Sequence, residues 1–345
     1  MKSKILWMVV LLTCITGVAS VFAAGGADSD AEGGMKTAAD LDIVYIPKNT
    51  GNPYFDSIIG GFEKAADELG FNFTTVAPAD AGATSQIPFL KTQIQRGVDV
   101  IAISPNSPDA LNQVFKQAMD EGIKVLIVNS DIPGSEDFRD VAILPMDFEV
   151  TGSSQVELMG SLIDYEGDIA VVSATADAPD QNYWIEGMKE ALKDSKYAKM
   201  NLVDVVYGDD DPQKSTTEAE ALLTKYPNLR GIISPTTVGV AASAQVVESA
   251  GRAPELQVTG LGTPNQMRRF IKNGTVEAFA LWSPFDEGYL AAYLGVALAT
   301  GEVEAAEGVD FEVPGLGTRT IGADRIVITG PPTVFTAENI DDFDF

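Results

Sequence analysis

The amino-acid sequence predicts an α/β fold with two consecutive lobes, each built around a doubly wound parallel sheet. Short β-branched runs alternate with longer amphipathic stretches along the chain, and several of these stretches end at a glycine. Alternating strands and helices form βαβ units with right-handed crossovers, which place the strands of a sheet parallel. The length of 345 residues also exceeds the usual ~100–150 residues of one domain, so we expect two.

The elements of the first lobe follow one another in strict alternation. The run at 98–103 is apolar apart from Asp99, as in a strand that is buried on both faces. Gly70 and Gly97 stand where helix C-caps are expected. Strands are predicted at 41–46, 72–76, 98–103, 124–128 and 142–144, and helices at 53–69, 85–96 and 109–121.

The same alternation starts again in the second half of the chain. Strands are predicted at 167–173, 201–207, 231–234, 257–261 and 278–282, and helices at 150–163, 182–192, 213–226, 239–249 and 264–273. We expect the segment 278–282 to complete the second sheet, and a long helix at 286–300 to follow it.

The N-terminal residues have the layout of a secretory signal peptide. Lys2 and Lys4 precede an apolar run that ends in small residues, so residues 1–23 are the expected signal and Ala23 its last residue. Residues 24–40 contain almost no large apolar side chain and should form a flexible leader. The only cysteine, Cys14, follows a threonine, which disfavours lipid anchoring there. We therefore expect a soluble protein outside the cytoplasmic membrane, in the periplasm.

The composition excludes several classes of function. The formal net charge is −27, a field that repels nucleic acid and anionic lipid surfaces. Histidine is absent, which removes the commonest general base and the commonest metal ligand. We expect no metal, no cofactor and no nucleic-acid partner.

Polar and aromatic residues gather just after the strands of the first lobe, where doubly wound sheets bind their ligands. Lys48, Asn52 and Phe55 follow the first strand and supply the mixture of polar groups and ring faces that a sugar needs. The alternative is that Asn52 caps a helix and Phe55 packs in the core. Asn129 and Asp131 follow the fourth strand, with a turn-forming role as the alternative for Asn129.

The second lobe presents a similar set. Asp180 and Gln181 precede a predicted helix, so an N-cap is the alternative role for Asp180. Pro235 and Thr237 follow the strand at 231–234. Trp282 ends the last predicted strand and is either a stacking platform or a core residue.

These segments resemble the periplasmic sugar-binding proteins of ABC importers with the ribose-binding (type I) fold, and more narrowly their rhamnose-binding and autoinducer-2-binding branch. The resemblance spans 41–345. It implies that Lys48, Asp180, Gln181 and Pro235 match ligand positions of the autoinducer-2 receptors. Asn129 and Thr237 depart from the aspartate and alanine found there, and the Pro-Thr-Thr-Val-Gly loop at 235–239 is more similar to the rhamnose branch. The segments that carry the resemblance are Asn52-Pro53-Tyr54-Phe55, Asn129-Ser130-Asp131, Asp180-Gln181-Asn182, Pro235-Thr236-Thr237-Val238-Gly239, Thr263-Pro264-Asn265 and Leu281-Trp282.

The resemblance also implies a three-segment hinge. It places 41–146 with 283–318 in an N-terminal lobe, 147–282 in a C-terminal lobe, and 319–345 in a tail that crosses the hinge. Hinge closure would then capture a small sugar-like ligand, and the partner would be a membrane permease, with a chemoreceptor as a second partner. The expected state is a monomer.

Two other classes of protein were weighed against this interpretation. An exported sugar-acting enzyme would use Asp131 and Asp180 as its acid–base pair, but the absence of histidine and of a phosphate-binding loop disfavours catalysis. A sugar-responsive transcription regulator shares the two-lobe core, but the signal peptide and the acidic charge disfavour it.

Overall fold

The first sheet draws its strands from both ends of the chain. The computed structural model describes residues 36–107, 109–131 and 134–345. The strand order is β13-β5-β4-β3-β1-β2, and each neighbouring pair is parallel. The strands are β1 (Asp42–Ile46), β2 (Asn72–Thr75), β3 (Val100–Ile103), β4 (Lys124–Val128), β5 (Val141–Leu144) and β13 (Ile326–Ile328).

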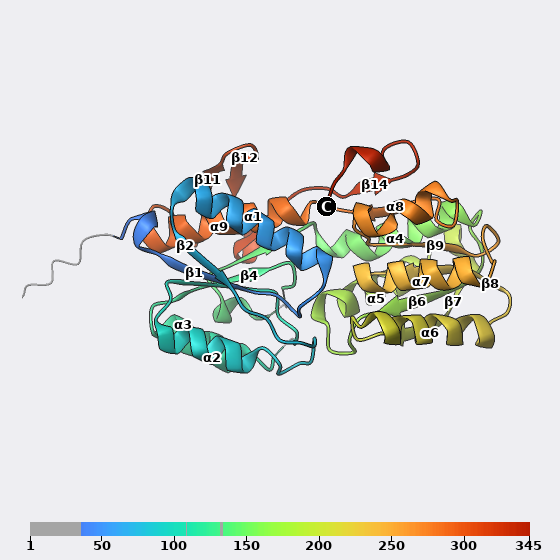
Figure 1. Ribbon diagram of the computed structural model, residues 1–345, viewed down its shortest axis with the longest axis horizontal. Coiled ribbons are helices and arrows are strands. Elements are labelled where there is room, and N and C mark those ends of the chain that lie inside the picture. Colours follow the sequence, from blue (N-terminus) through green and yellow to red (C-terminus); the bar gives the residue numbers. More distant parts are fainter. Residues whose placement is uncertain (1–35, 108, 132–133) are drawn as a thin grey trace, which may run out of the picture. The chain divides into compact units, whose positions relative to one another are not determined.

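Helices cover both faces of this sheet (Figure 1). Alternate strand residues point to opposite faces, so Val100 packs in the core under α1 (Pro53–Leu69) and α9 (Pro284–Thr300). Ile101 packs in the core under α2 (Ile87–Arg96) and α3 (Asn112–Asp120). Helix α9 thus follows the second sheet in sequence and packs on the first.

The second sheet is also parallel, with the order β7-β6-β8-β9. Its strands are β6 (Glu166–Ser173), β7 (Lys199–Tyr207), β8 (Leu229–Ser234) and β9 (Gln257–Gly260). Residues of α4 and α5 pack on one face and those of α6 and α7 on the other, and α8 lies against α7. The helices are α4 (Phe148–Leu162), α5 (Pro179–Ala191), α6 (Pro212–Lys225), α7 (Thr237–Ser249) and α8 (Pro264–Lys272). The α/β fold with two parallel, doubly wound sheets is confirmed.

The C-terminal segment forms strands that the sequence did not predict. Strand β10 (Phe279–Leu281) was expected to complete the second sheet, but it pairs antiparallel with β14 (Thr333–Phe335). A single bridge between Leu261 and Ala280 joins it to the end of β9. The expectation was wrong. Sequence patterns near β10 do not reveal this pairing, because β14 lies more than fifty residues further along the chain. Strands β11 (Asp310–Val313) and β12 (Gly317–Thr320) form a separate hairpin.

Local sequence signals are confirmed at several element ends. Gly70 and Gly97 end α1 and α2 in the left-handed conformation, with φ of 83° and 68°. The leader is ordered earlier than predicted, because Ala38–Asp40 form a 3-10 helix whose Asp40 carboxylate accepts hydrogen bonds from Thr37. The expected signal peptide, Cys14 and the leader up to residue 35 lie outside the described residues.

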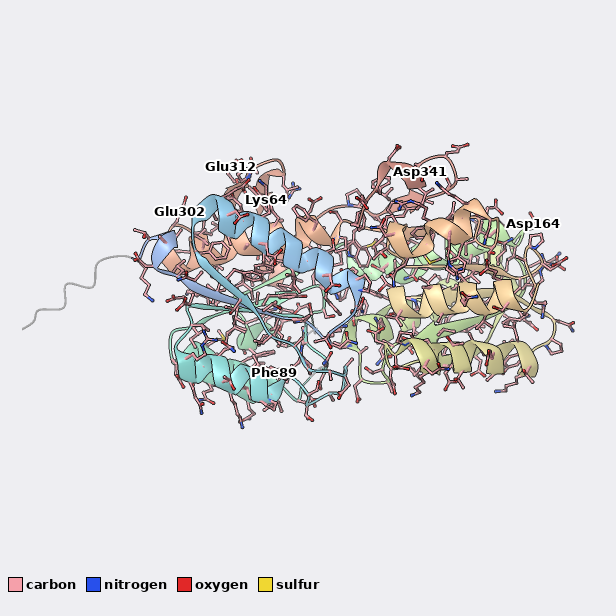
Figure 2. All side chains as sticks on the ribbon, viewed as in Figure 1. Lys64, Phe89, Asp164, Glu302, Glu312 and Asp341 are labelled. Carbon is pink, nitrogen blue, oxygen red and sulfur yellow. The ribbon has the colours of Figure 1, made fainter. Side chains whose placement is uncertain are left out.

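Exposed charged side chains of the described chain include those that Figure 2 labels, which are Lys64, Asp164, Glu302, Glu312 and Asp341. Within the described ranges, none of the helices has the length and apolar character needed to cross a membrane.

Helices α1 and α9 approach each other at glycines. A methyl group on Gly288 would lie 2.0 Å from the carbonyl oxygen of Ile58, and one on Gly61 would lie 2.2 Å from that of Phe285. Such contacts are far inside van der Waals distance, so the two backbones can pack this closely only without side chains. This packing also fixes the first turn of α9, which lies beside the site described below.

We expect Gly288→Ala to lower the free energy of unfolding by about 1–3 kcal/mol, because the helices must move apart to admit the methyl group. Chemical denaturation followed by circular dichroism measures the change. Gly60→Ala is the matched control, because its methyl group would meet the Phe285 ring at an ordinary 3.6 Å. Equal stability of the two variants would contradict the proposed close contact.

Candidate functional site

A small cavity lies at the carboxyl ends of the strands of both sheets. Its volume is about 30 Å³, which is room for roughly two water molecules. Its lining comes from loops and helix starts that follow β1 and β4 of the first sheet, β6, β7, β8 and β9 of the second, and from β10 and its end. The lining residues are Lys48, Asn52, Tyr54, Phe55, Asn129, Asp180, Gln181, Trp184, Asp210, Pro235, Thr236, Thr237, Leu261, Leu281 and Trp282.

A buried ion pair joins the two sides of this cavity. Lys48 follows β1, and Asp180 lies in the first turn of α5. The Lys48 Nζ atom is 2.8 Å and 2.9 Å from the two carboxylate oxygens of Asp180, and the side chains are only 4% and 1% exposed. Two charges withdrawn from water in this way are stable only while each has its partner. Asp180 does not cap α5, because the N-cap residue is Ala178.

Asn52 caps α1 and also lies in the cavity lining. Its Oδ1 accepts a hydrogen bond from the backbone N–H of Tyr54 at 3.1 Å, which caps α1. The same oxygen accepts from the hydroxyl of Thr237 across the cavity, also at 3.1 Å. Asn52, at the start of a helix that packs on the first sheet, therefore also contacts the start of α7, which packs on the second sheet.

Asn129 likewise serves both the turn and the cavity. Its backbone is left-handed, with φ of 72°, a conformation that asparagine tolerates better than most residues. Its side chain is buried, and its Oδ1 lies 2.5 Å from the hydroxyl oxygen of Tyr54. The turn directs the amide into the cavity.

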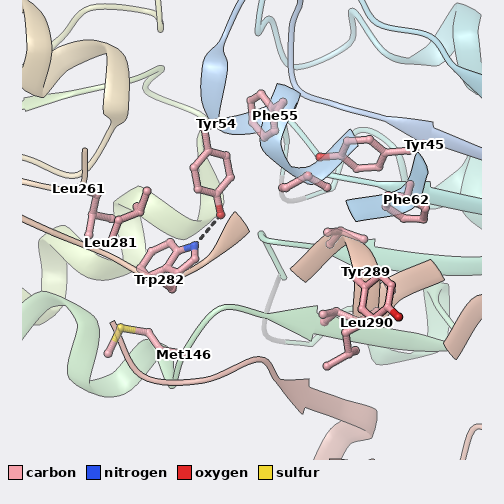
Figure 3. Packing of buried hydrophobic residues seen from close by; sticks show 14 of the residues in the cluster. Tyr45, Tyr54, Phe55, Phe62, Met146, Leu261, Leu281, Trp282, Tyr289 and Leu290 are labelled. Atoms are coloured by element: carbon pink, nitrogen blue, oxygen red, sulfur yellow. Dashed lines mark hydrogen bonds between the residues drawn. The ribbon is translucent and has the colours of Figure 1, made fainter. Parts of the chain in front are cut away.

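Aromatic rings form one wall of the cavity. Trp282 packs edge-on against Trp184 and Tyr54, with ring centroids 5.8 Å and 6.4 Å apart. Its Nε1 donates a hydrogen bond to the Tyr54 hydroxyl at 2.7 Å, the dashed contact in Figure 3. Trp282 is thus both a buried core residue and part of the lining. Phe55 lies beside Tyr54 and contributes a further ring.

Asp131 is the one predicted site residue that the structure does not bring to this cavity. Its carboxylate accepts hydrogen bonds from Nε and Nη2 of Arg139, at 2.8 Å and 2.6 Å. This two-point contact is buried and engages both carboxylate oxygens. In this structure the partner of Asp131 is thus a guanidinium group of its own chain, and a role of Asp131 in ligand binding stays a prediction.

The structure adds lining residues that the sequence analysis missed. Asp210 follows β7 with a left-handed backbone, φ 52°, and its carboxylate accepts a hydrogen bond from Thr236. Burial raises the pKa of the Asp210 carboxyl above its ordinary value. Tyr54, which belongs to a segment that carries the resemblance, and Trp184 were not among the predicted site residues, although both line the cavity. The strand-end rule could have found Asp210, because it follows the strand predicted at 201–207.

Comparisons with known proteins define the family. A model described as "Periplasmic binding protein domain" matches residues 43–303. A sugar ABC transporter protein from Actinomyces odontolyticus is 39% identical, with 90% of this chain and 100% of that chain covered and a TM-score of 0.72. The chain belongs to the periplasmic binding proteins, and its fold is that of the type I sugar-binding members.

Two further solved structures resemble the chain. A solute-binding protein of an ABC transporter from Clostridium phytofermentas, solved with bound L-rhamnose, is 33% identical, with 88% of this chain and 97% of that chain covered and a TM-score of 0.83. LsrB from Clostridium saccharobutylicum, solved in complex with AI-2, is 24% identical, with 88% and 100% covered and a TM-score of 0.83. The likeness to LsrB, at 24% identity, concerns the fold alone.

We expect Asp131→Ala to lower the free energy of unfolding by about 3–5 kcal/mol, because it leaves the buried Arg139 guanidinium without its counter-charge. Chemical denaturation measures the loss. Asp120→Ala is the control, because Asp120 pairs with Lys116 on an exposed helix surface and such pairs contribute little. A loss no greater than that of the control would refute the structural role of the pair.

Proposed function

We propose that this chain is the extracytoplasmic receptor of an ABC importer, and that it captures a small neutral sugar of the rhamnose-like deoxyhexose class. The observation that carries the proposal is the cavity itself, where polar and aromatic side chains from the ends of two separate sheets meet. Support for the sugar class comes from the 33% identical relative solved with L-rhamnose.

The chemistry of the lining favours a polyol. Lys48 and Asp180 neutralise each other, so the centre of the site does not demand a charged ligand. The Trp184 Nε1 donor and the Gln181 Oε1 acceptor are buried and have no hydrogen-bond partner in the described part of the chain. An unsatisfied buried polar atom costs about 1–3 kcal/mol. A sugar hydroxyl both donates and accepts, so hydroxyl groups can satisfy both atoms.

Hinge closure is the proposed mechanism. A cavity of about 30 Å³ does not admit a monosaccharide until its two walls separate. Between the two sheets the chain runs through 145–147, 282–283 and 329–332, which we propose as hinge segments. The proposed lobes are 41–146 with 283–318 and 147–282, and the tail from 319 adds β13 to the first sheet. A ligand that contacts both walls stabilises the closed form, and the permease would recognise that form.

Autoinducer-2 is the second candidate ligand. Lys48, Asp180, Gln181 and Pro235, the positions that match its receptors, all line the cavity. Asn129 and Thr237 line it too, and these are the positions that depart from that pattern. A sugar-acting enzyme gains no support, because Asp131 is bound to Arg139 and does not face Asp180 across the cavity.

We expect isothermal calorimetry to detect saturable binding of one molecule of L-rhamnose, or of another deoxyhexose, with the sugar recovered unchanged. The same panel should include pentoses and autoinducer-2. Exclusive binding of autoinducer-2 would replace the sugar class with the second candidate, and chemical conversion of the sugar would overturn the receptor proposal.

We expect Asp180→Asn to weaken L-rhamnose binding by roughly 10–100-fold, because hydrogen bonds to a charged group contribute about 1.5–3 kcal/mol. Calorimetry measures the affinity, and circular dichroism confirms that the variant is folded. Asp209→Asn is the matched control. Asp209 is exposed, pairs with Lys214, and directly precedes the lining residue Asp210. Unchanged affinity in the Asp180 variant would show that the ligand binds elsewhere.

A further inference from the structure

The hydroxyl group of Tyr54 is the meeting point of three other buried side chains. Its oxygen lies 2.7 Å from Nε1 of Trp282, 2.5 Å from Oδ1 of Asn129 and 2.8 Å from Oε2 of Glu287. Glu287 is fully buried in the first turn of α9. It does not line the cavity, but Tyr54, Asn129 and Trp282 do. The glutamate contacts the cavity lining through the Tyr54 hydroxyl and the backbone of Asn129.

The orientation of the Asn129 amide follows from its other neighbours. Its Nδ2 lies 3.3 Å from the hydroxyl of Ser130 and 3.5 Å from Oδ2 of Asp180. An ionised carboxylate can only accept hydrogen bonds, so the NH₂ end of the amide must face Asp180. The oxygen end then faces Tyr54 and has to accept a hydrogen bond from it.

Counting protons around Tyr54 then fixes the state of Glu287. A phenol hydroxyl carries one proton and can accept from two donors. The proton goes to Asn129, and the indole N–H of Trp282 takes one of the acceptor sites. The 2.8 Å contact with Glu287 needs a proton of its own, and that proton can come only from the carboxyl group. A neutral Glu287 supplies the missing proton, so that each of the three contacts of the Tyr54 hydroxyl holds one hydrogen.

The surroundings of Glu287 favour this neutral state. Burial is the largest cause that raises the pKa of its carboxyl from 4.5 to about 8. The hydrogen bonds with Tyr54 and with the Asn129 backbone lower this pKa, as does the positive charge of Lys48, whereas the negative charge of Asp180 raises it further. The other titratable groups that face Glu287 are Tyr54 and Tyr45, and burial raises the pKa of both phenols, so they stay neutral as well.

We propose that Glu287 is a positioning residue whose neutral carboxyl group donates a hydrogen bond to Tyr54, and thereby orients Asn129 and Trp282 toward the bound sugar. Its effect on affinity rests on the proposed function, whereas its protonation does not. When Glu287 loses its proton, Tyr54 must donate to the carboxylate instead. The Asn129 oxygen then faces an acceptor at 2.5 Å, and its amide has to turn away from Asp180.

The inference predicts a defined dependence on pH. Affinity for L-rhamnose should be constant up to about pH 7 and should fall about tenfold at pH 9, one unit above the pKa of Glu287. The free energy of unfolding follows the same group. Because the folded state keeps a proton that the unfolded chain releases near pH 4.5, this contribution is complete below that pH and is lost as the pH rises to about 8.

The experiment compares the wild-type protein with Glu287→Gln, which keeps a neutral donor but cannot ionise. Calorimetry with L-rhamnose from pH 6 to pH 9 should give similar affinities for both at pH 6, and no alkaline loss for the variant. Glu287→Ala should bind weakly at every pH. Other titratable cavity groups, Asp180, Asp210 and Lys48, are unchanged in these variants, so a pH dependence that they cause would persist in Glu287→Gln.

Infrared spectroscopy tests the protonation without any ligand. The carbonyl band of a protonated carboxyl group should be present in the wild-type protein at pH 7, fall to about half near pH 8, and be absent in Glu287→Gln. Glu68→Gln is the matched control, because Glu68 also bonds to tyrosines, Tyr289 and Tyr293, but hydrogen bonds from Lys64 and from those tyrosines lower the pKa of its carboxyl to about 2.

The outcomes separate the two proposals. A band that is absent at pH 7, or that survives in Glu287→Gln, overturns the assignment of the proton. An alkaline loss of affinity that persists in Glu287→Gln overturns the positioning role. Absence of any L-rhamnose binding, together with the expected band, rejects the proposed ligand and the role in affinity while leaving the neutral carboxyl established.

Discussion

The ion pair between Lys48 and Asp180 is the contact around which the rest of the site is arranged. Both charges are almost completely withdrawn from water, and they come from the ends of two different sheets. A buried pair is tolerated only when its remaining hydrogen-bonding capacity is met nearby. The Asn129 amide donates a hydrogen bond to Asp180, and its oxygen contacts the Tyr54 hydroxyl. Tyr54 in turn contacts Glu287, so a continuous series of polar contacts connects the ion pair with Glu287.

The same side chains that hold the local structure also line the cavity at this site. Asn52 begins α1 and also meets Thr237, and Trp282 fills the core while its Nε1 holds the tyrosine hydroxyl. The sequence analysis treated these roles as alternatives, although a short polar residue at a helix start or turn is already held rigidly. Such a residue presents its remaining hydrogen-bonding capacity at low entropic cost, so the cap itself preorganises the cavity.

Local signals predicted most helices and strands, because periodicity and capping act over a few residues. The pairing of β10 with β14, and of β13 with β5, joins segments far apart in sequence, and no local pattern encodes it. The strand-end rule found the cavity lining except for a few residues, and it did not anticipate the contact of Asp131 with Arg139, because it ignores competing partners within the chain. Glu287 carried no signal, since an acidic residue in a first helical turn is ordinary.

The late position of α9 and β13 in the chain bears on how the protein matures. The first sheet cannot acquire its covering helix until the residues after 283 are available, and its edge strand β13 comes later still, at Ile326–Ile328. During synthesis, apolar residues such as Val100 and Leu126 would remain without the helix α9 that packs on them in the folded protein. A nascent chain therefore cannot complete its first half until its C-terminal residues have been synthesised.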